Sequence, residues 1–582
     1  MRTTTKHKDT PIAQKDTDWQ KIRKRARLGF IVVSIIFVAY SALFIFRSSF
    51  ILSDGKRYFC LHDDAMISMR YAWNWSHGLG LVWNAGERIE GYTNPLMVAL
   101  MSLVSHFFDK NLSCLVVQVL GIGILLGCAF LCSRIIMQLM SDDDRNTSDK
   151  YQRNTSMFRP MCIILGFSAP LLYYPLVYWG LMGMETGLLT LILLTITYIL
   201  FKWGESLGVG RVLAIAVFCG LAYLTRPDAV VAVAILFAYL FARLIRSLGV
   251  VRAGSWMTVI VLVFGVIIAA HLTFRWFYYG QLLPNTYILK ATGMSRLQFI
   301  QNGWLFVRNF FNAPSLGLFI LTLLACFFSC SEKRLTILLM FASLVGYQIY
   351  IGGDPFIHWR ILCPAVPSLL LVAIVEMQRL VLFACNSTLY QKCFRTSRIL
   401  FTKYVLVPFI AVLFLIVITG LNWHCTTEIR TFQPYTVIHN RNNCERAIAI
   451  LMLTRPEASV GVFWAGAIPY YTGRRSVDFL GKCDDVISRL APNTSLPKRP
   501  HHMGMFTLPG HNKYDLNYSI KKLMPDYVQG GFYIYEQDIR KWARNHYVSV
   551  SNGRVGLSFK KGSPNVLWHK LKPYDSSRTD KP

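Results

Sequence analysis

Long apolar segments recur along most of this chain, and they restrict it to a membrane-protein fold. The first, LGFIVVSIIFVAYSALFIF, begins at residue 28, and the chain is 53% hydrophobic and only 16% charged. A helix of about 20 apolar residues crosses a hydrocarbon core of about 30 Å. We therefore predict a polytopic α-helical membrane protein with about eleven transmembrane helices. The other ten segments cover approximately residues 114–136, 161–179, 182–201, 211–225, 228–245, 256–277, 313–330, 335–351, 363–385 and 403–422.

The basic residues predict the orientation in the membrane. Residues 1–27 form a polar tail ending in KIRKRAR, so the first apolar segment is typical of a retained signal anchor with a cytoplasmic N-terminus. The short segment 94–108 is not counted as crossing, because counting it would move most loop Lys and Arg out of the cytoplasm. The loop residues kept in the cytoplasm include Arg134, Arg145, Lys150, Arg153, Arg159, Lys202, Arg211, Arg243, Arg246, Arg252, Lys333, Arg334, Lys392, Arg395, Arg398 and Lys403. The net charge of +30 then favours anionic membrane lipids, and not nucleic acid, as partners.

Three loops and the C-terminal part meet on the opposite side in this topology. The loops are residues 47–113, 278–312 and 352–362. Residues 423–582 mix strand-like pieces, ASVGVFWAGAIPYY and DYVQGGFYIY, with Gly and Pro, which predicts an extracytoplasmic α/β domain. The expected domains are therefore a cytoplasmic tail (1–27), a transmembrane domain (28–422) with an outer loop at 47–113, and a soluble domain (423–582).

Cysteine spacing predicts no metal site. The 14 cysteines include no CxxC pair and no Cys/His spacing of a zinc site. Cys425, Cys444 and Cys483 fall in the extracytoplasmic part, where a disulfide can form but its pairing does not follow from the sequence.

Two neighbouring acids, Asp63 and Asp64, open the stretch HDDAMISMRYAWNW in the first outer loop. One of them can be the N-cap of a helix from Ala65 to about Ser76, closed by Gly78 or Gly80. One cap suffices for one helix, so the second acid needs another explanation. A pair of acids can also share the work of taking a proton from a hydroxyl and orienting a substrate or a divalent cation. The residue types alone leave these two interpretations equally weighted.

The surrounding sequence resembles a known enzyme class. The stretch HDDAMISMRYAWNWSHGLGLVWNAGERIEGYTNP resembles the first outer loop of GT-C membrane glycosyltransferases, most of all the family of arabinan-terminating β-(1→2)-arabinofuranosyltransferases. Six further blocks follow in the same order: GLMGMETGLLTLILL, LAYLTRPDA, YYGQLLPNTYILKA, GGDPFIHWRILCPAVP, WAGAIPYYTGRRSVDFLG and GHNKYDLNYSIKKLMPDYV. The resemblance implies a GT-C-like fold and a polyprenyl-phosphate sugar donor. It makes Asp64 the first choice for the general base. Asp63 would orient the acceptor, share the base role, or hold a divalent cation (Mg²⁺ or Mn²⁺), the one cofactor considered.

The same blocks supply residues for the donor phosphate and sugar. Arg226, Lys290 and Arg360 are candidates for the phosphate, because Arg and Lys stabilise the charge of a departing phosphate. Two of them have a simpler alternative: Arg226 as a snorkelling interfacial arginine with its helix-starting acid Asp228, and Lys290 as a solvated loop lysine. Capping is the alternative role for Asn94 and Glu185, and a surface position is the alternative for His358. The other candidates are Glu90, Asn94, Glu185, Asp228, Asn285, Asp354 and His358.

We therefore expect an integral-membrane glycosyltransferase that moves a sugar, plausibly arabinofuranose, from polyprenyl phosphate to a glycan or protein acceptor. Its implied location is a bacterial plasma (inner) membrane, with the active site on the periplasmic side. The alternative is a transporter or flippase of lipid-linked sugars, which would show inverted repeats and charges near the bilayer midplane. The stereochemistry stays open, because base-assisted displacement alone does not explain retention of a β linkage. The His before the acid pair and PFIHWR after GGD depart from the family, so the sugar can differ from arabinose.

Overall fold

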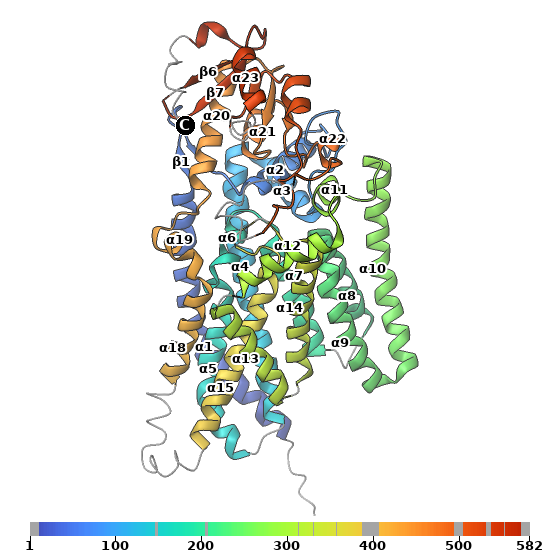
Figure 1. Cartoon of the computed structure of the whole chain (residues 1–582). Helices are drawn as coiled ribbons and strands as arrows, with labels where there is room; N and C mark the ends of the chain where they lie inside the picture. Colours follow the sequence, from blue (N-terminus) through green and yellow to red (C-terminus); the bar gives the residue numbers. More distant parts are fainter. Residues whose placement is uncertain are drawn as a thin grey trace, which may run out of the picture.

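A bundle of apolar helices carries a smaller helix-and-sheet region at one end (Figure 1). The computed structural model describes residues 11–145, 149–203, 208–311, 313–329, 331–354, 356, 358–386, 407–493, 505–530, 537–551 and 553–571. The predicted basic residues Lys392, Arg395, Arg398 and Lys403 and the first ten residues of the tail lie outside these ranges. The helices of the bundle are α1 (Pro11–Ser48), α4 (Lys110–Arg145), α5 (Asp149–Leu172), α6 (Tyr174–Leu181), α7 (Thr186–Trp203), α8 (Val209–Thr225), α9 (Val230–Leu248), α10 (Val250–Tyr279), α13 (Ala313–Ser329), α14 (Glu332–Ile351), α15 (Val366–Asn386), α18 (Val407–Leu421) and α19 (Thr426–Thr431).

The apolar segments fold as helices, as the sequence predicts. Among the described residues, seven helices are long and apolar enough to cross a membrane, or nine if each bent pair is one span. The chain is thus a multi-pass membrane protein, and the count of eleven stays a prediction. The predicted span 161–179 is bent: α5 and α6 meet at an angle of 53°. Pro175 lies in the first turn of α6, where it lacks the N–H and the space to continue the preceding helix.

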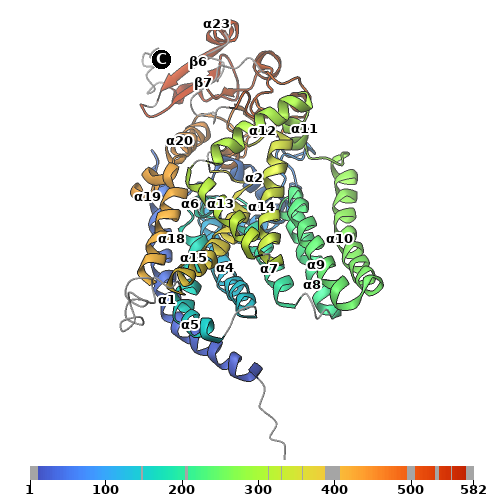
Figure 2. The ribbon, with the colours of Figure 1, turned by 60° about the horizontal axis from the view of Figure 1, so that its bottom comes forward.

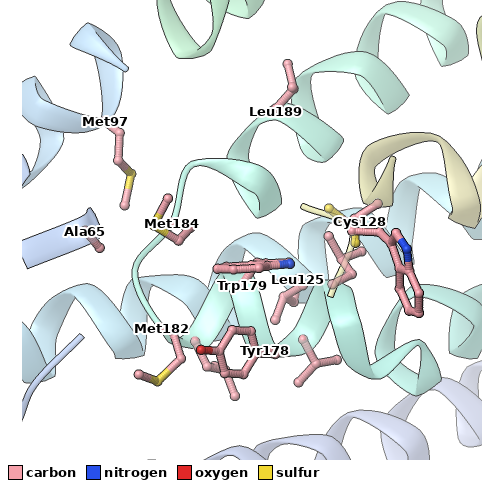
Figure 3. Close-up of a cluster of buried hydrophobic side chains, with 14 of the residues drawn as sticks. Ala65, Met97, Leu125, Cys128, Tyr178, Trp179, Met182, Met184 and Leu189 are labelled. Atoms are coloured by element: carbon pink, nitrogen blue, oxygen red, sulfur yellow. The ribbon is translucent and has the colours of Figure 1, made fainter. Parts of the chain in front are cut away.

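The segment between residues 94 and 108 is a short helix. α3 (Pro95–Phe107) has 13 residues, so it is about 20 Å long, less than the hydrocarbon core of about 30 Å. It packs along α2 (Asp63–Ser76), which carries the acid pair. Met97 of α3, Ala65 of α2 and Trp179 of α6 belong to one buried apolar cluster with Met184 (Figure 3). α2 is therefore fixed against the bundle through its apolar face.

The C-terminal part contains a five-stranded mixed sheet in the order β4-β3-β5-β7-β6. β3 (Ser459–Val462) runs parallel to β4 (Arg475–Asp478) and β5 (Tyr527–Val528), and β7 (Gly556–Lys560) pairs antiparallel with β5 and β6 (Tyr547–Ser551). The predicted α/β character is confirmed, although the IPYY piece forms a helix and not a strand. The helices of this part are α20 (Val437–Leu453), α21 (Ala467–Thr472), α22 (Asp485–Ser488), a π-helix (Asn517–Lys522) and α23 (Gln537–His546).

Loop elements fill the space between the bundle and the C-terminal part. α11 (Asn285–Ala291) contacts α22, and α12 (Arg296–Phe310) lies along α14. Figures 1 and 2 both place these helices below the C-terminal part. The three predicted loops and the C-terminal part therefore do meet at one end of the bundle. A small hairpin, β1 (Phe50–Ile51) with β2 (Arg57–Tyr58), and 3-10 turns at Pro227–Ala229, Cys363–Ala365, Trp423–Cys425 and Trp568–Lys570 complete the described elements.

Candidate functional site

The acid pair forms the first turn of α2, where the bundle meets the C-terminal part. His62 is the N-cap, because its Nδ1 accepts a hydrogen bond from the Asp64 N–H at 3.3 Å. The interpretation of Asp63 or Asp64 as the cap is therefore wrong. The helix ends at Ser76 as predicted, and Gly78 follows with a φ of 77°, which glycine adopts without strain. Both carboxylates are thus available for contacts outside their own helix.

Both carboxylate oxygens of Asp64 face cations. Lys482 Nζ lies 2.5 Å from Oδ1, and Arg360 Nη1 lies 3.2 Å from Oδ2. Burial opposes ionisation, but Lys482 and Arg360 outweigh it and hold the pKa of Asp64 well below its usual range. Asp64 is therefore an ionised carboxylate whose two oxygens are already engaged.

Asp63 is held by the C-terminal part. Its Oδ1 accepts a hydrogen bond from the Ala467 N–H at 3.3 Å. A Cβ on Gly466 would lie 2.2 Å from the Asp63 carbonyl oxygen, so only glycine allows this approach. Burial raises the pKa of Asp63 to about 7, against the opposing charge of Lys482. Among the described residues Asp63 joins no group of three metal-ligating side chains, and its role as a ligand of Mg²⁺ or Mn²⁺ stays a prediction.

The raised pKa of Asp63 predicts a pH-dependent stability. The folded carboxyl loses its proton near pH 7, whereas its ordinary pKa is 3.8. The stability that protonated Asp63 contributes is therefore complete below about pH 4 and lost as the pH rises through about 7. Asp63→Asn stays neutral, so we expect its melting temperature in detergent to fall less than the wild-type value between about pH 4 and 7. Exposed Asp538→Asn should behave as wild type; equal pH slopes for Asp63→Asn and wild type would contradict this expectation.

A cavity of about 380 Å³ opens beside Asp64. Its charged lining contains as many acids as cations, and apolar side chains such as Ile67 and Val231 cover other parts of the wall. A ligand with both an anionic and an apolar part suits such a cavity. The acids that line the cavity are Asp64, Glu185, Asp228 and Asp354, and the cations are Arg226, Lys290, Arg360 and Lys482.

Arg226 is fixed by two acids. Its Nε and Nη2 donate to Asp228 at 2.9 and 2.8 Å, and this confirms the predicted contact between the two residues and shows that it is bidentate. Nη1 lies 2.6 Å from Glu185 Oε1, and Glu185 Oε2 accepts from Asn94 Nδ2 at 3.0 Å. Asn94 precedes α3 in the N-cap position, but its side chain makes no capping bond. The structure thus brings four predicted residues into one network on the cavity wall.

Arg360, Asp354 and Lys290 form a second group. Arg360 Nη2 lies 3.3 Å from Asp354 Oδ1, and Lys290 Nζ lies 3.9 Å from the same oxygen. Asp354 Oδ2 is buried without a hydrogen-bond partner. Burial lowers the pKa of Lys290 to about 8, with Asp354 acting in the opposite direction. Lys290, with 30% of its side chain exposed, is weakly engaged and can turn to a bound anion.

Lys482 is the residue that the sequence interpretation missed. The block WAGAIPYYTGRRSVDFLG ends at Gly481, one residue before it. Gly481 has a φ of 75°, and a Cβ there would lie 2.6 Å from Ile487. Asn285 Nδ2 donates to the carbonyls of Gly481, Lys482 and Asp484 at 2.9, 3.0 and 3.1 Å. Asn285 is thus a positioning residue, because it fixes the turn that directs Lys482 toward Asp64.

Besides Asp63 and Asn285, two further predicted residues do not line the cavity. Glu90 forms a buried ion pair with Arg275 at 2.9 Å, and its carbonyl accepts from the Asn285 N–H at 2.9 Å. His358 is fully buried, with Nε2 3.1 Å from Glu428. Neither side chain lines the cavity, so this arrangement offers no direct contact between them and a bound sugar.

Arg70 of α2 holds the C-terminal part against the bundle. Its guanidinium is buried and donates to the carbonyls of Pro469 and Arg474 and to Ser476 Oγ, the last at 3.3 Å. Asn84 Oδ1 accepts a further bond at 2.9 Å. Pro469, Arg474 and Ser476 belong to the segment that precedes Lys482 in the chain. Arg70 therefore supports the approach of Lys482 to Asp64.

We expect Arg70→Met to loosen this contact. Several buried carbonyls would lose their donor, and each unsatisfied group costs about 1–3 kcal/mol. The melting temperature should fall by several degrees, and limited proteolysis should cut the C-terminal part faster. Exposed Arg540→Met is the matched control. Wild-type protease resistance in Arg70→Met would contradict the role of Arg70.

Comparisons with known proteins give one family model and several similar solved structures. Residues 436–567 match the model of a family described as a domain of unknown function, DUF8728. The structure resembles ArnT from Cupriavidus metallidurans bound to undecaprenyl phosphate (13% identity, 76% of this chain, 85% of that chain, TM-score 0.46). It also resembles the Archaeoglobus fulgidus oligosaccharyltransferase in the apo form (12% identity, 95% and 75%, TM-score 0.46).

A curated relative supports the same resemblance by sequence. It is a terminal β-(1→2)-arabinofuranosyltransferase from Corynebacterium glutamicum, 26% identical over an alignment that covers 54% of this chain. The chain spans about half the length of this relative, 48%. The predicted resemblance is confirmed: in sequence this chain is similar to a terminal β-(1→2)-arabinofuranosyltransferase.

Proposed function

We propose that this chain is a membrane glycosyltransferase that moves a sugar from a polyprenyl-phosphate donor to an acceptor. The carrying observation is that Asp64, a fully ionised acid, lies between Lys482 and Arg360 on the wall of a cavity that is part charged and part apolar. The cations suit the phosphate of the donor, and the apolar wall suits its polyprenyl chain. The carboxylate suits the proton of an acceptor hydroxyl.

The donor phosphate competes with Asp64 for the same cations. In the free chain Lys482 and Arg360 neutralise Asp64, and Lys290 lies near Asp354. A phosphate brings a larger negative charge and several acceptor oxygens, so the cations turn toward it. The Asp64 oxygens are then released, and its pKa rises toward the range in which it can accept a proton. The Asp64 carboxylate is thus free to act as a base only while a donor is bound.

The transfer step follows from this arrangement. The acceptor hydroxyl gives its proton to Asp64, and its oxygen forms the bond to the anomeric carbon of the sugar. The bond between that carbon and the phosphate oxygen breaks, and polyprenyl phosphate leaves with the electron pair. Lys290, Lys482 and Arg360 stabilise the charge that develops on it. A retaining course would need a second displacement, for which Asp63 is the neighbouring carboxyl.

The finer assignments rest on similarity and charge. Arabinofuranose is the proposed sugar, because the curated relative is a terminal β-(1→2)-arabinofuranosyltransferase. A glycan or a protein is the proposed acceptor. We propose that the cavity lies outside the cytoplasm of a bacterial inner membrane, since α9 ends at the opposite end of the bundle (Figure 1) and its last turns carry Arg243 and Arg246.

A transfer assay tests this proposal. The purified chain in proteoliposomes is offered polyprenyl phosphates that carry arabinofuranose or a hexose, together with candidate glycan and protein acceptors. We expect sugar to appear on an acceptor with an equal amount of polyprenyl phosphate released. Movement of the intact lipid-linked sugar across the bilayer without that release would favour a flippase and overturn the proposal.

A further inference from the structure

A second group of polar side chains is buried beside the predicted outer loop 352–362, the loop that carries Arg360. His358 belongs to this loop, and Cys425 and Glu428 follow the bend after α18. All three are buried, and one ligand atom from each lies within 4.8 Å of the other two. The proposed transfer step uses none of them.

The contacts within this group are close, yet they do not satisfy the imidazole. His358 Nδ1 lies 3.4 Å from Cys425 Sγ, and Nε2 lies 3.1 Å from Glu428 Oε1. Nε2 is nevertheless buried without a hydrogen-bond partner, because the short contact is not aligned for one. A buried ring nitrogen without an aligned hydrogen bond costs free energy, and a ligand that binds this nitrogen would remove that cost.

The geometry around Glu428 directs one oxygen to this group. Its Oε2 accepts hydrogen bonds from Tyr174 Oη at 3.0 Å and from the Tyr435 N–H at 3.1 Å. Oε1 is left facing His358. Hydrogen bonds of this kind orient carboxylate ligands in metal sites.

The spacing of the donor atoms suits a tetrahedral ion. Zinc binds nitrogen and carboxylate oxygen at about 2.0–2.2 Å and sulfur at about 2.3 Å, which places two such donors about 3.3–3.6 Å apart. The 3.1 Å between His358 Nε2 and Glu428 Oε1 lies close to that range, and one ligand atom from each of the three residues lies within 4.8 Å of the other two. A thiolate and a carboxylate would also balance the double charge of the ion in a buried site.

We propose that His358, Cys425 and Glu428 bind one zinc ion. The sulfur, imidazole and single carboxylate favour zinc over Mg²⁺ or Mn²⁺. The zinc ion would link the loop that carries Arg360 to the segment after α18. It would thereby fix the position of the Arg360 guanidinium, which faces Asp64. The site gives no signal in cysteine spacing, because His358 and Cys425 are 67 residues apart.

Metal content of the full-length chain tests this proposal. The protein is purified in detergent with a tag free of histidine, exposed to zinc, passed through gel filtration and analysed by mass spectrometry of its metals. We expect one zinc per wild-type chain and almost none in Cys425→Ser. Cys219→Ser, which removes a buried thiol of α8, should keep the zinc.

Cobalt substitution gives a second measurement, and its result for the wild-type chain does not depend on the folding of a variant. Wild type and Cys219→Ser should show a thiolate-to-cobalt charge-transfer band, which Cys425→Ser should lack. Folded wild type that emerges without zinc and without this band would overturn the proposal and leave a metal-free contact among the three side chains. Equal zinc in wild type and folded Cys425→Ser would overturn it as well, because the ion would then lie elsewhere.

Discussion

Asp64→Asn is expected to lower the transfer rate by about 10²–10⁴-fold, the usual contribution of a general base. The amide cannot accept the acceptor proton, although it keeps the size of the carboxyl group. It also frees Lys482 and Arg360 from their partner. We therefore expect polyprenyl phosphate to bind the variant at least as tightly as it binds wild type. Transfer under single turnover and binding of polyprenyl phosphate are measured side by side.

The transfer rate and the affinity for polyprenyl phosphate, measured in the same variant, distinguish a general base from an acid with a structural role. If Asp64 only held the two cations in place, its loss would weaken donor binding together with the rate. Exposed Asp538→Asn controls for the loss of one negative charge and should transfer as wild type does. Undiminished transfer by Asp64→Asn would remove Asp64 from the base role. A lower melting temperature that polyprenyl phosphate restores would show the unpaired Lys482 accepting a phosphate.

The bundle could be predicted because membrane helices need long apolar segments, and these are visible in the sequence. The bend between α5 and α6 could not, because Pro170 and Pro175 inside an apolar segment allow either a kinked span or a broken one. The short length of the helix at 94–108 is confirmed, and its not crossing the membrane stays a prediction. Length and composition thus identify the helices, whereas the bends depend on how neighbouring helices pack.

The candidate site was predictable where one segment supplies both partners. Arg226 and Asp228 are two residues apart, so their contact follows from LTRPD itself. Lys482 is 418 residues from Asp64, and nothing near it in the sequence distinguishes it from a solvated lysine. Only the approach of the C-terminal part, fixed by Arg70 and Asn285, brings it to the acid. His62 was missed as the cap because Asp is the commoner residue there.

Lys482→Met is expected to weaken donor binding and, as a separate effect, to raise the pKa of Asp64. Removal of a charged donor to phosphate costs about 1.5–3 kcal/mol, so the donor KM should rise about 10–100-fold. Asp64 would keep only Arg360 as a partner, and its lowered pKa would rise toward the ordinary value. Protonation would then remove the base at a higher pH than in wild type. We therefore expect the acid limb of the kcat/KM profile to move to higher pH.

The direction of this limb distinguishes a lysine that holds Asp64 from one that only binds phosphate. A simple phosphate ligand would change KM and leave the acid limb of free enzyme where it is. Lys482→Arg keeps the charge, so it should restore the limb and part of the affinity. Exposed Lys541→Met should leave both unchanged. If Lys482→Met kept the wild-type acid limb, the proposed competition between donor phosphate and Asp64 for the same cation would be wrong, even if KM rose.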